Sequence, residues 1–361
     1  MSEPLKNLYC EELIASLSRE LEAVYRQFDS ERFRENIFSD DWAQKELKAR
    51  MMHISVTLHK FLPSNYRKTI EILKSVSSHF SGFEYMFFPG YVELYGLNEY
   101  EDSISALEYF TEFSSSEFAV RPFIKKYKRR MMVQMEKWAD SSNHHVRRLA
   151  SEGCRPRLPW AMALPEFKEN PAPVLKILEK LKDDDSEYVR RSVANNLNDI
   201  SKDNPLILID VAQKWLGKNP NMDRLVKHAC RSLLKQGQHE ILELFGFVKP
   251  DHISIEAFKI QESVNMGENL EFSFILKTQQ GKLGKLRIEY AVDFMKNNGN
   301  LSRKLFKISE SDYSSSKKVI TKHHSFKNIS TRKYYTGIHG LAVIVNGKEL
   351  AKGNFRLSEK A

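Results

Sequence analysis

Apolar residues at helical spacing run through residues 1–250. In ELIASLSRELEAVYRQF (12–28) and again in RKTIEILKSVSSHF (67–80), apolar positions recur three or four residues apart, which predicts helices. The segment 81–99 is rich in aromatic residues and carries three glycines. We expect it to be a helix end and a connection packed under the first repeat. The first 250 residues are therefore expected to be helical.

A second pattern is a repeat of 43 residues within this helical half. Val146-Arg147-Arg148 recurs as Val189-Arg190-Arg191, and Asp140 falls on Asp183. A period in the low forties with two helices per period is typical of HEAT-type repeats, in which each pair buries its apolar face only against its neighbours. The pattern predicts a continuous stack that pairs 118–127 with 130–139, 144–154 with 174–182, 188–200 with 206–216, and 224–236 with 240–247.

The pattern changes after Phe247. Apolar and polar residues now alternate, β-branched and aromatic residues are frequent, and Gly and Asn mark the turns. Strands are expected at 253–260, 269–278, 285–296, 303–310, 317–326, 340–347 and 349–357. This set predicts an immunoglobulin-like β-sandwich, with a small barrel as the alternative. The chain is thus expected to be mostly α: a HEAT-like helical-repeat solenoid over residues 1–250, then a small all-β immunoglobulin-like sandwich over residues 251–361.

Composition is that of an ordinary globular protein, with 41% hydrophobic and 29% charged residues. Apolar runs stay well short of the roughly 18 residues that a membrane span needs, and the first residues lack an apolar signal core. We therefore expect no membrane partner and a cytoplasmic location. The three cysteines, Cys10, Cys154 and Cys230, lie far apart, which indicates buried thiols in a reducing compartment rather than a disulfide or a metal site.

Positive charge is concentrated in two regions. Residues 121–160 hold 11 Lys/Arg against 3 Asp/Glu, and residues 251–361 hold 19 against 11, so each region has a net charge of +8. The whole chain has a net charge of +9 and a pI of about 9.2. Solubility alone would explain a basic pI, but this clustering favours an anionic partner held along a cationic groove.

Within the first repeat, Arg148, Glu152 and Arg155 are spaced four and three residues apart. These intervals place the three side chains on one helix face as a row of cation, carboxylate and cation. One interpretation is a surface ladder of ion pairs. The other is functional: the arginines grip phosphates, and the carboxylate between them stays ionised near a bound sugar.

Four more residues have both a structural and a functional interpretation. Trp160 lies between two prolines and is either a packing plug or a platform for a base or sugar. Glu117 complements the N-terminal dipole of the next helix or takes part in chemistry. Asn196 and Asp199 are polar positions inside a helical pattern, suited either to capping or to a ligand on a concave face.

Known catalytic signatures are missing from the sequence, including the nucleophile elbow, the Walker loop, the dinucleotide fingerprint, HExxH and CxxC. The adjacent His144 and His145 point to different helix faces and form a poor metal site. We therefore expect no metal and no cofactor. Pattern alone indicates a cationic HEAT-type solenoid with a β-sandwich that binds nucleic acid.

Four motifs add a resemblance to a known family. FFPGYVELYGL (87–97), SSEFAVRPF (115–123), HHVRRLASEGCRPRLPWA (144–161) and SVANNLNDISKDNP (192–205) resemble the AlkC branch of bacterial alkylpurine DNA glycosylases. The resemblance covers almost all of the helical half. One subgroup of that family also carries a C-terminal immunoglobulin-like domain, to which residues 251–361 are similar in kind.

The resemblance implies a monofunctional glycosylase. It would excise cationic N-alkylated purines, above all 3-methyladenine, from double-stranded DNA in the bacterial cytoplasm, without flipping the base. The expected catalytic carboxylates are Glu117, Glu152 and Asp199, which would stabilise the sugar cation and activate water. The expected DNA contacts in the helical half are Arg148, Arg155, Arg157, Trp160, Arg191 and Asn196. Asn196 stands where the related AlkD enzymes use an aromatic residue, which argues against a simple aromatic cradle.

In the C-terminal half, the expected DNA contacts are Lys282, Lys285 and Arg287 in QQGKLGKLR. A monomer is expected. Two other functions stay open at this point. The solenoid could be a non-catalytic scaffold for nucleic acid or an acidic protein, or the β-sandwich could be a protein-interaction module supported by the solenoid.

Overall fold

The computed structural model describes residues 4–38, 41–329 and 332–359. The chain divides into two compact units, Met1–Ala229 and Cys230–Ala361. The sequence places the border at 250/251, close to the first strand, which begins at Ile253. By contacts, however, the last two helices group with the strands and not with the helical stack.

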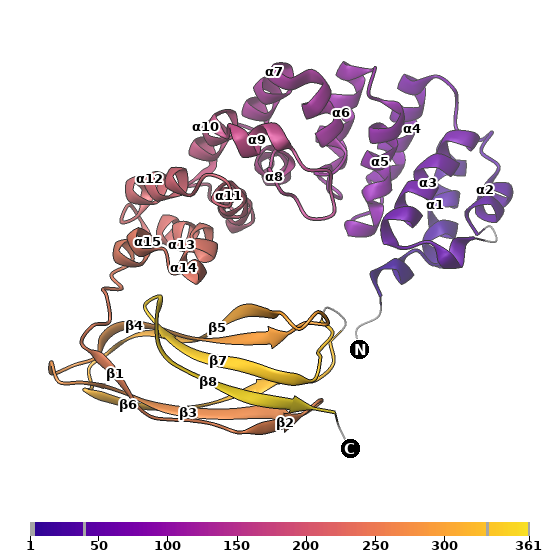
Figure 1. The fold of residues 1–361 in the computed structure, drawn as a ribbon. Coiled ribbons are helices and arrows are strands. Elements are labelled where there is room, and N and C mark those ends of the chain that lie inside the picture. Colours follow the sequence, from indigo (N-terminus) through magenta and orange to yellow (C-terminus); the bar gives the residue numbers. More distant parts are fainter. Residues whose placement is uncertain (1–3, 39–40, 330–331, 360–361) are drawn as a thin grey trace. The chain divides into compact units, whose positions relative to one another are not determined.

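The first unit is built from α-helices with short 3-10 turns (Figure 1). The 3-10 turns are η1 (Leu5–Leu8), η2 (Trp42–Gln44) and η3 (Phe83–Met86). The α-helices are α1 (Glu11–Val24), α2 (Ser30–Ile37), α3 (Leu47–Phe61), α4 (Tyr66–Ser77), α5 (Phe87–Tyr95), α6 (Tyr100–Phe110), α7 (Val120–Trp138), α8 (His144–Gly153), α9 (Pro165–Glu169), α10 (Ala172–Leu181), α11 (Glu187–Ile200), α12 (Pro205–Trp215) and α13 (Pro220–Ala229).

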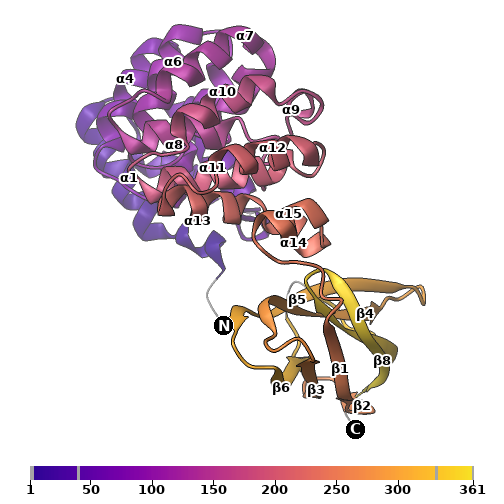
Figure 2. The ribbon, with the colours of Figure 1, turned by 90° about the vertical axis from the view of Figure 1, so that its left-hand side faces the viewer.

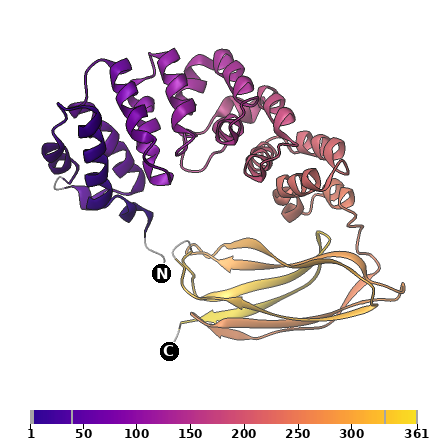
Figure 3. The same cartoon turned by 180° about the vertical axis from the view of Figure 1, so that it is seen from behind.

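The 43-residue repeat corresponds to a row of stacked helices. α8, α11 and α13 pack against one another in succession, and α10 and α12 each pack against two of them (Figures 1 and 3). The repeated valines, Val146 on α8 and Val189 on α11, are both fully buried. The expected pairs 144–154 with 174–182 and 188–200 with 206–216 are therefore confirmed as α8 with α10 and α11 with α12.

Of three further expected elements, one is present and two differ from the structure. The helices expected over 118–127 and 130–139 are both present as the two parts of α7, separated by a kink at Lys128, where the backbone leaves helical geometry at φ 34°. The helix expected over 224–236 breaks at Cys230 into α13 and α14 (Arg231–Gln236). The segment 81–99 is mostly η3 and α5, not a connection.

Helix α5 escapes a simple sequence reading because it contains both a proline and a glycine. Pro89 falls in the first turn, where proline is tolerated. Gly90 lets α5 approach α3 closely, since a Cβ there would lie 3.0 Å from the Ser55 Oγ. The aromatic residues that blur the helical pattern, such as Phe87 and Tyr91, are buried on this helix.

The second unit contains α14, α15 (His239–Leu244) and a β-sandwich (Figures 1 and 2). One sheet has the order β1-β3-β6 and the other β2-β8-β7-β4-β5. The strands are β1 (Ile253–Ile260), β2 (Ser263–Asn265), β3 (Asn269–Thr278), β4 (Gly284–Met295), β5 (Leu301–Tyr313), β6 (Lys317–Ser325), β7 (Gly337–Val345) and β8 (Lys348–Ser358).

Period-two alternation buries one face of each sheet in a shared core that includes Phe272, Ile288 and Phe355. The seven expected strands are confirmed, and the expected sandwich, not a small barrel, is the fold. The sequence misses only the three-residue β2, which pairs in parallel with β8. Among the described residues, no helix has the length and apolar character of a membrane span.

Candidate active site

The row predicted in the first repeat exists, and side chains from other parts of the helical unit extend it at both ends. Arg155 Nη1 lies 2.5 Å from Glu152 Oε1, and Arg148 Nη2 lies 3.8 Å from the same oxygen. Arg148 Nη1 donates to Glu117 Oε2 at 2.7 Å, and Arg155 Nε donates to Asp199 Oδ2 at 2.8 Å. The three candidate carboxylates therefore belong to one ionic network.

Two further groups complete this network. Lys202 Nζ donates to Asp199 Oδ1 at 3.0 Å, so both oxygens of that carboxylate are occupied. Ser192 Oγ donates to Glu152 Oε2 at 2.6 Å, and Ser192 in turn accepts from Ser151 Oγ at 2.7 Å. The network contains equal numbers of positive and negative side chains: Arg148, Arg155 and Lys202, and Glu117, Glu152 and Asp199.

Most of the network is buried, which strengthens each interaction within it. The side chain of Arg148 is 17% exposed and that of Arg155 only 8%. Burial alone would lower the pKa of Arg148, but the nearby Glu117 and Glu152 hold that pKa above its ordinary value. Both arginines therefore stay charged. In this structure Arg155 binds carboxylates from a buried position, which differs from the expected surface contact with phosphate.

Glu117 differs from the other two carboxylates because it borders open space. It precedes α7 and lines a cavity of about 330 Å³ together with Arg148, Tyr188 and His145. Ser115 Oγ donates to Glu117 Oε2 at 2.8 Å, and Arg148 donates to the same oxygen. Both hydrogen bonds that the structure describes for this carboxylate thus fall on Oε2, which leaves Oε1 for water or a substrate.

Trp160 is presented on a loop and is not a packing plug. Its side chain is 59% exposed, and its φ of 64° is unusual for a residue with a side chain. A buried guanidinium shapes the loop: Arg121 on α7 donates to the carbonyl oxygens of Gly153, Arg155 and Met162. Such local backbone strain is most often found at functional sites.

Asn196 requires a correction. Its side chain is completely buried, and its Nδ2 donates to the Ser151 carbonyl oxygen at 2.8 Å, which joins α11 to α8. The expected DNA contact is therefore replaced by a packing role. The polar residue is explained by the need to pair a backbone carbonyl between two closely packed helices.

Two other candidate arginines of the helical half are exposed. Arg157 forms a two-pronged pair with Asp203, at 2.7 and 3.0 Å. Arg191 lies on α11 and lines a shallow groove of about 310 Å³ between α11 and α13. Arg190, Arg224 and His228 line the same groove, so it is rich in nitrogen donors of the kind that contact phosphates.

The candidates of the second unit separate into two groups. Lys282 and Lys285 are exposed, as expected for DNA contacts. Arg287 is only 5% exposed and pairs with Glu289 at 2.7 Å and with Glu310 at 3.0 Å. This burial contradicts its expected DNA contact. Arg287 lies in β4 between Leu286 and Ile288, which face the sandwich core, so its side chain lies on the opposite face of the sheet and forms buried ion pairs there.

Several residues of this site were not expected from the sequence. Ser115 and Ser192 donate hydrogen bonds to carboxylates. The ring centroid of Tyr188 lies 4.7 Å from the Arg148 guanidinium carbon. Arg121 shapes the loop. Ser115 could have been found from its place two residues before Glu117. The others act across more than 30 residues, and only the tertiary structure brings them together.

Comparison with known proteins identifies the family of the chain. A family model described as "DNA alkylation repair enzyme" matches residues 96–241, and one described as "Uncharacterised protein YhaZ, C-terminal Ig-like domain" matches residues 254–359. The chain is 46% identical over 346 residues to the "Uncharacterized protein YhaZ" of Bacillus subtilis, covering 95% of this chain and 96% of that protein.

A solved structure matches over the whole length. The alkylpurine DNA glycosylase AlkC of Pseudomonas fluorescens, bound to DNA containing an abasic site analog, is 36% identical with a TM-score of 0.94. The alignment covers 99% of this chain and 100% of that one. The chain belongs to the AlkC branch of the DNA alkylation repair enzymes. Its C-terminal Ig-like domain is the one expected for a subgroup of this branch.

Membership of the AlkC branch confirms the resemblance seen in the four sequence motifs. All four motifs contribute to the first unit described above. Three of them supply the ionic network: 115–123 carries Glu117, 144–161 carries the arginine row, and 192–205 carries Asp199. The motif 87–97 forms α5, which borders a separate cavity.

Proposed function

We propose that this member of the AlkC branch is a monofunctional DNA glycosylase that hydrolyses the N-glycosidic bond of cationic N-alkylated purines, with 3-methyladenine preferred. Its partner would be double-stranded DNA containing alkylated bases, and the protein would act as a monomer without a cofactor. The observation that carries the proposal is the Glu117 carboxylate, which is fixed by Ser115 and Arg148 through one oxygen and belongs to a residue that lines a cavity.

The chemistry needs only a few protein groups because a positively charged base is already a good leaving group. In the proposed step, the C–N bond breaks, its electron pair leaves with the base, and the base becomes neutral. A water oxygen bonds to the sugar C1′, and Glu117 takes a proton from that water. A carboxylate close to C1′ also stabilises the positive charge that develops on the sugar. Flipping the base is not required for these steps.

Glu152 and Asp199 have a different role in this proposal. Both oxygens of each carboxylate are occupied by internal partners, so neither is placed to activate water directly. They instead fix Arg155, while Glu152 also lies near Arg148, which in turn fixes Glu117. We therefore describe Glu152 and Asp199 as positioning residues and Glu117 as the catalytic carboxylate.

The exposed groups would bind the DNA around this centre. Trp160 offers an aromatic surface for the lesion nucleotide or its backbone, and Arg157 and Arg191 offer guanidinium groups for phosphates. Lys282 and Lys285 on the second unit are proposed to bind phosphates away from the lesion.

Release of free base from methylated DNA, measured by chromatography under single-turnover conditions without added metal, tests the function. We expect Glu117→Gln to slow release by about 10²–10⁴-fold, as for loss of a general base. Glu112→Gln is the matched control, because Glu112 lines the same cavity but is outside the network. Glu152→Gln and Asp199→Asn should also slow release and, in addition, lower the stability of the fold.

Wild-type rates in all three carboxylate variants would contradict the catalytic assignment. Tight DNA binding with no release of base by the wild-type protein would contradict the glycosylase proposal itself. The balanced ionic network would then serve only to hold α7, α8 and α11 together, and the protein would be a non-catalytic DNA-binding scaffold.

A further inference from the structure

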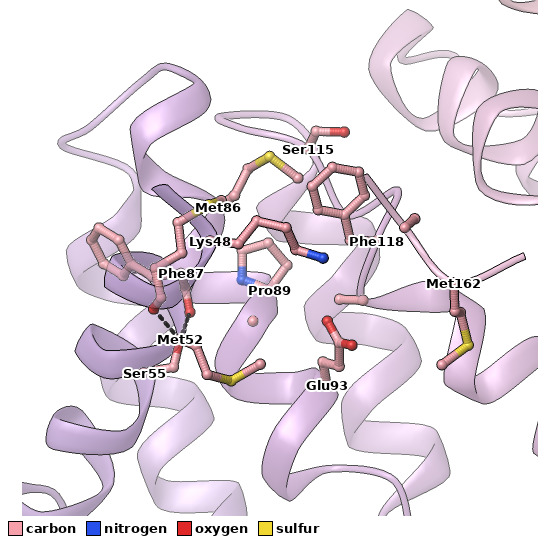
Figure 4. Close-up of a pocket in the computed structure, with 14 residues that line it drawn as sticks. Lys48, Met52, Ser55, Met86, Phe87, Pro89, Glu93, Ser115, Phe118 and Met162 are labelled. Atoms are coloured by element: carbon pink, nitrogen blue, oxygen red, sulfur yellow. Dashed lines mark hydrogen bonds between the residues drawn. The ribbon is translucent and has the colours of Figure 1, made fainter. Parts of the chain in front are cut away.

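A second cavity lies beside the candidate active site, in the same unit. It has a volume of about 230 Å³ and is bordered by α3, α5 and the segments 115–119 and 161–162 (Figure 4). Its walls are mainly apolar, and the side chains that form them include Met51, Met52, Met86, Phe118 and Met162. Thioether side chains are polarisable and adapt to the shape of aromatic ligands.

Two charged groups of opposite sign interrupt these apolar walls. Lys48 on α3 and Glu93 on α5 both line the cavity, and Figure 4 shows the Lys48 amine and the Glu93 carboxylate on the same side of it. Burial raises the pKa of the Glu93 carboxyl, while Lys48 offsets part of this shift. Among the described residues, no hydrogen bond to the Glu93 carboxylate is present, so its oxygens can accept from a ligand.

Lys48 is exposed, is held by two contacts and has spare donors. Its Nζ donates to the Trp160 carbonyl oxygen at 2.5 Å and lies over the Phe118 ring at 5.3 Å from the centroid. An ammonium group has three N–H donors, and this contact uses one of them. An amine with free donors and a carboxylate with free acceptors therefore border the same small apolar space.

The cavity adjoins the proposed catalytic centre. Ser115 lines both cavities, and its hydroxyl donates to Glu117. Ala161 and Met162, which directly follow Trp160, form part of the wall. A molecule released next to Glu117 would thus be close to this second cavity.

We propose that this cavity binds the free N-alkyladenine base after its bond to the sugar is broken; the proposal rests on the function proposed above. The edge of adenine presents an exocyclic amino donor next to a ring nitrogen acceptor. Glu93 would accept from the amino group and Lys48 would donate to the ring nitrogen. The methionines would contact the rings and the alkyl group.

The size of the cavity agrees with such a ligand. Pockets for drug-sized molecules are usually about 300–1,000 Å³. A cavity of about 230 Å³ is smaller and suits a single planar heterocycle. No covalent bond forms when the free base binds in this cavity, so the cavity would be a product site. A bound base would leave the protein more slowly and would inhibit further turnover.

Isothermal titration of the full chain with free 3-methyladenine, in the absence of DNA, tests the proposal. Glu93→Gln and Lys48→Met should each weaken binding about tenfold or more, as expected when a charged hydrogen-bond partner is lost. Lys60→Met, an exposed position on the same helix as Lys48, and Glu71→Gln, exposed on α4, are the matched controls and should bind as the wild type does.

A third variant tests the space itself. Met52 lines the cavity but is 41% exposed, so Met52→Trp can fill the cavity without disturbing the core. It should abolish measurable binding while its circular dichroism spectrum stays unchanged. Unmodified adenine should bind several-fold more weakly than 3-methyladenine, because it lacks the alkyl group that the methionines contact.

Three outcomes would overturn the proposal: no binding to the wild-type protein, equal binding by wild type and all three cavity variants, or equal affinity for adenine and 3-methyladenine. These outcomes are separate from failure of the proposed function, because the titration involves no turnover. If methylated DNA releases base but the free base does not bind, the cavity proposal alone is wrong. If methylated DNA releases no base, the proposed function is wrong.

Discussion

The first repeat, on α8, and the second repeat, on α11, have the same packing positions but different polar residues. Val146 and Val189 are both buried, and each is followed by an arginine that binds the loop preceding its own helix. Nη1 of each arginine donates to the carbonyl oxygens of two residues before the helix: Ser141 and Ser142 for Arg147, and Asp184 and Asp185 for Arg190.

The positions that differ are those of the ionic network. Arg148 binds two carboxylates, whereas its equivalent Arg191 is exposed in a groove. Glu152 is replaced in the second repeat by Asn195, whose Oδ1 lies 3.0 Å from a ring nitrogen of His228. Arg155 is replaced by Asn198. The comparison shows that the framework is repeated, whereas the row of Arg148, Glu152 and Arg155 at the centre of the network lies on and just after α8 and has no equivalent on α11.

The largest expected difference between the repeats concerns Arg148 and Arg191. Arg148→Met leaves Glu117 and Glu152 short of a buried counter-charge, so we expect it to lower the free energy of unfolding by about 3–5 kcal/mol. Arg191→Met, at an exposed position, should change it by less than about 0.5 kcal/mol. Urea unfolding at neutral pH measures both.

Arg191 is expected to matter for DNA binding, although its loss hardly changes stability. If Arg191 contacts one phosphate, its removal lowers the slope of log affinity against log salt by about 0.9. Equal losses of stability in the two variants would show that the repeats do not differ in the way described. An unchanged salt dependence in Arg191→Met would remove this residue from the DNA interface.

An intermediate effect is expected at Arg147 and Arg190, the two arginines that bind the loops before their helices. Arg147→Met and Arg190→Met should each lower the free energy of unfolding by about 1–3 kcal/mol, because each variant leaves loop carbonyl oxygens without this donor. The loss should be greater for Arg147, which also pairs with both oxygens of Asp184 at 2.6 and 2.9 Å. If only one variant lost stability, the two arginines would not have the same structural role in the two repeats.

The smallest expected effect is a pH dependence at the junction of the two repeats. Burial alone would raise the pKa of Asp184, but Arg147 and the Ser186 N–H hold that pKa below its ordinary value. A carboxyl with a depressed pKa stabilises the fold above its ordinary pKa, and this contribution is lost as pH falls toward the folded-state value. Unfolding free energies measured from pH 7 downward should therefore fall less steeply in Asp184→Asn than in the wild type.

Asp185→Asn is the control for that measurement, since Asp185 is the exposed neighbour and only its backbone carbonyl contacts Arg190. It should follow the wild-type acid profile. Parallel profiles for all three proteins would mean that Asp184 and Arg147 interact too weakly to couple the repeats.

Much of the fold could be predicted from the sequence because the signals are local. Apolar spacing gave most of the helices, alternation gave seven of the strands, and the Val-Arg-Arg repeat gave the stacking of α8 on α11. The sequence did not give α2, α3, α5, α6 and α9 as separate helices, and it missed the break at Cys230. Glycine and proline usually indicate a turn or a helix end, but in α5 the close approach to α3 at Gly90 explains the glycine inside a helix.

The candidate site was predictable only in part. The four- and three-residue spacing of Arg148, Glu152 and Arg155 indicates a row on one face, and the structure contains it. The same reasoning placed Asn196 and Arg287 on a DNA-binding surface, where the structure buries both. Residue type and spacing do not reveal which face of a helix or strand turns toward a neighbour.

The sequence by itself determined the two architectures, the helical repeat, the concentration of positive charge and the family. These properties depend on composition, on short periods and on motifs of adjacent residues. The tertiary structure alone decided that Arg148 meets Glu117 and Arg155 meets Asp199, across 31 and 44 residues. It also decided that Glu117 borders open space while Glu152 and Asp199 do not. The physical reason is that packing, which joins residues distant in the chain, fixes both the partner and the solvent exposure of each charged group.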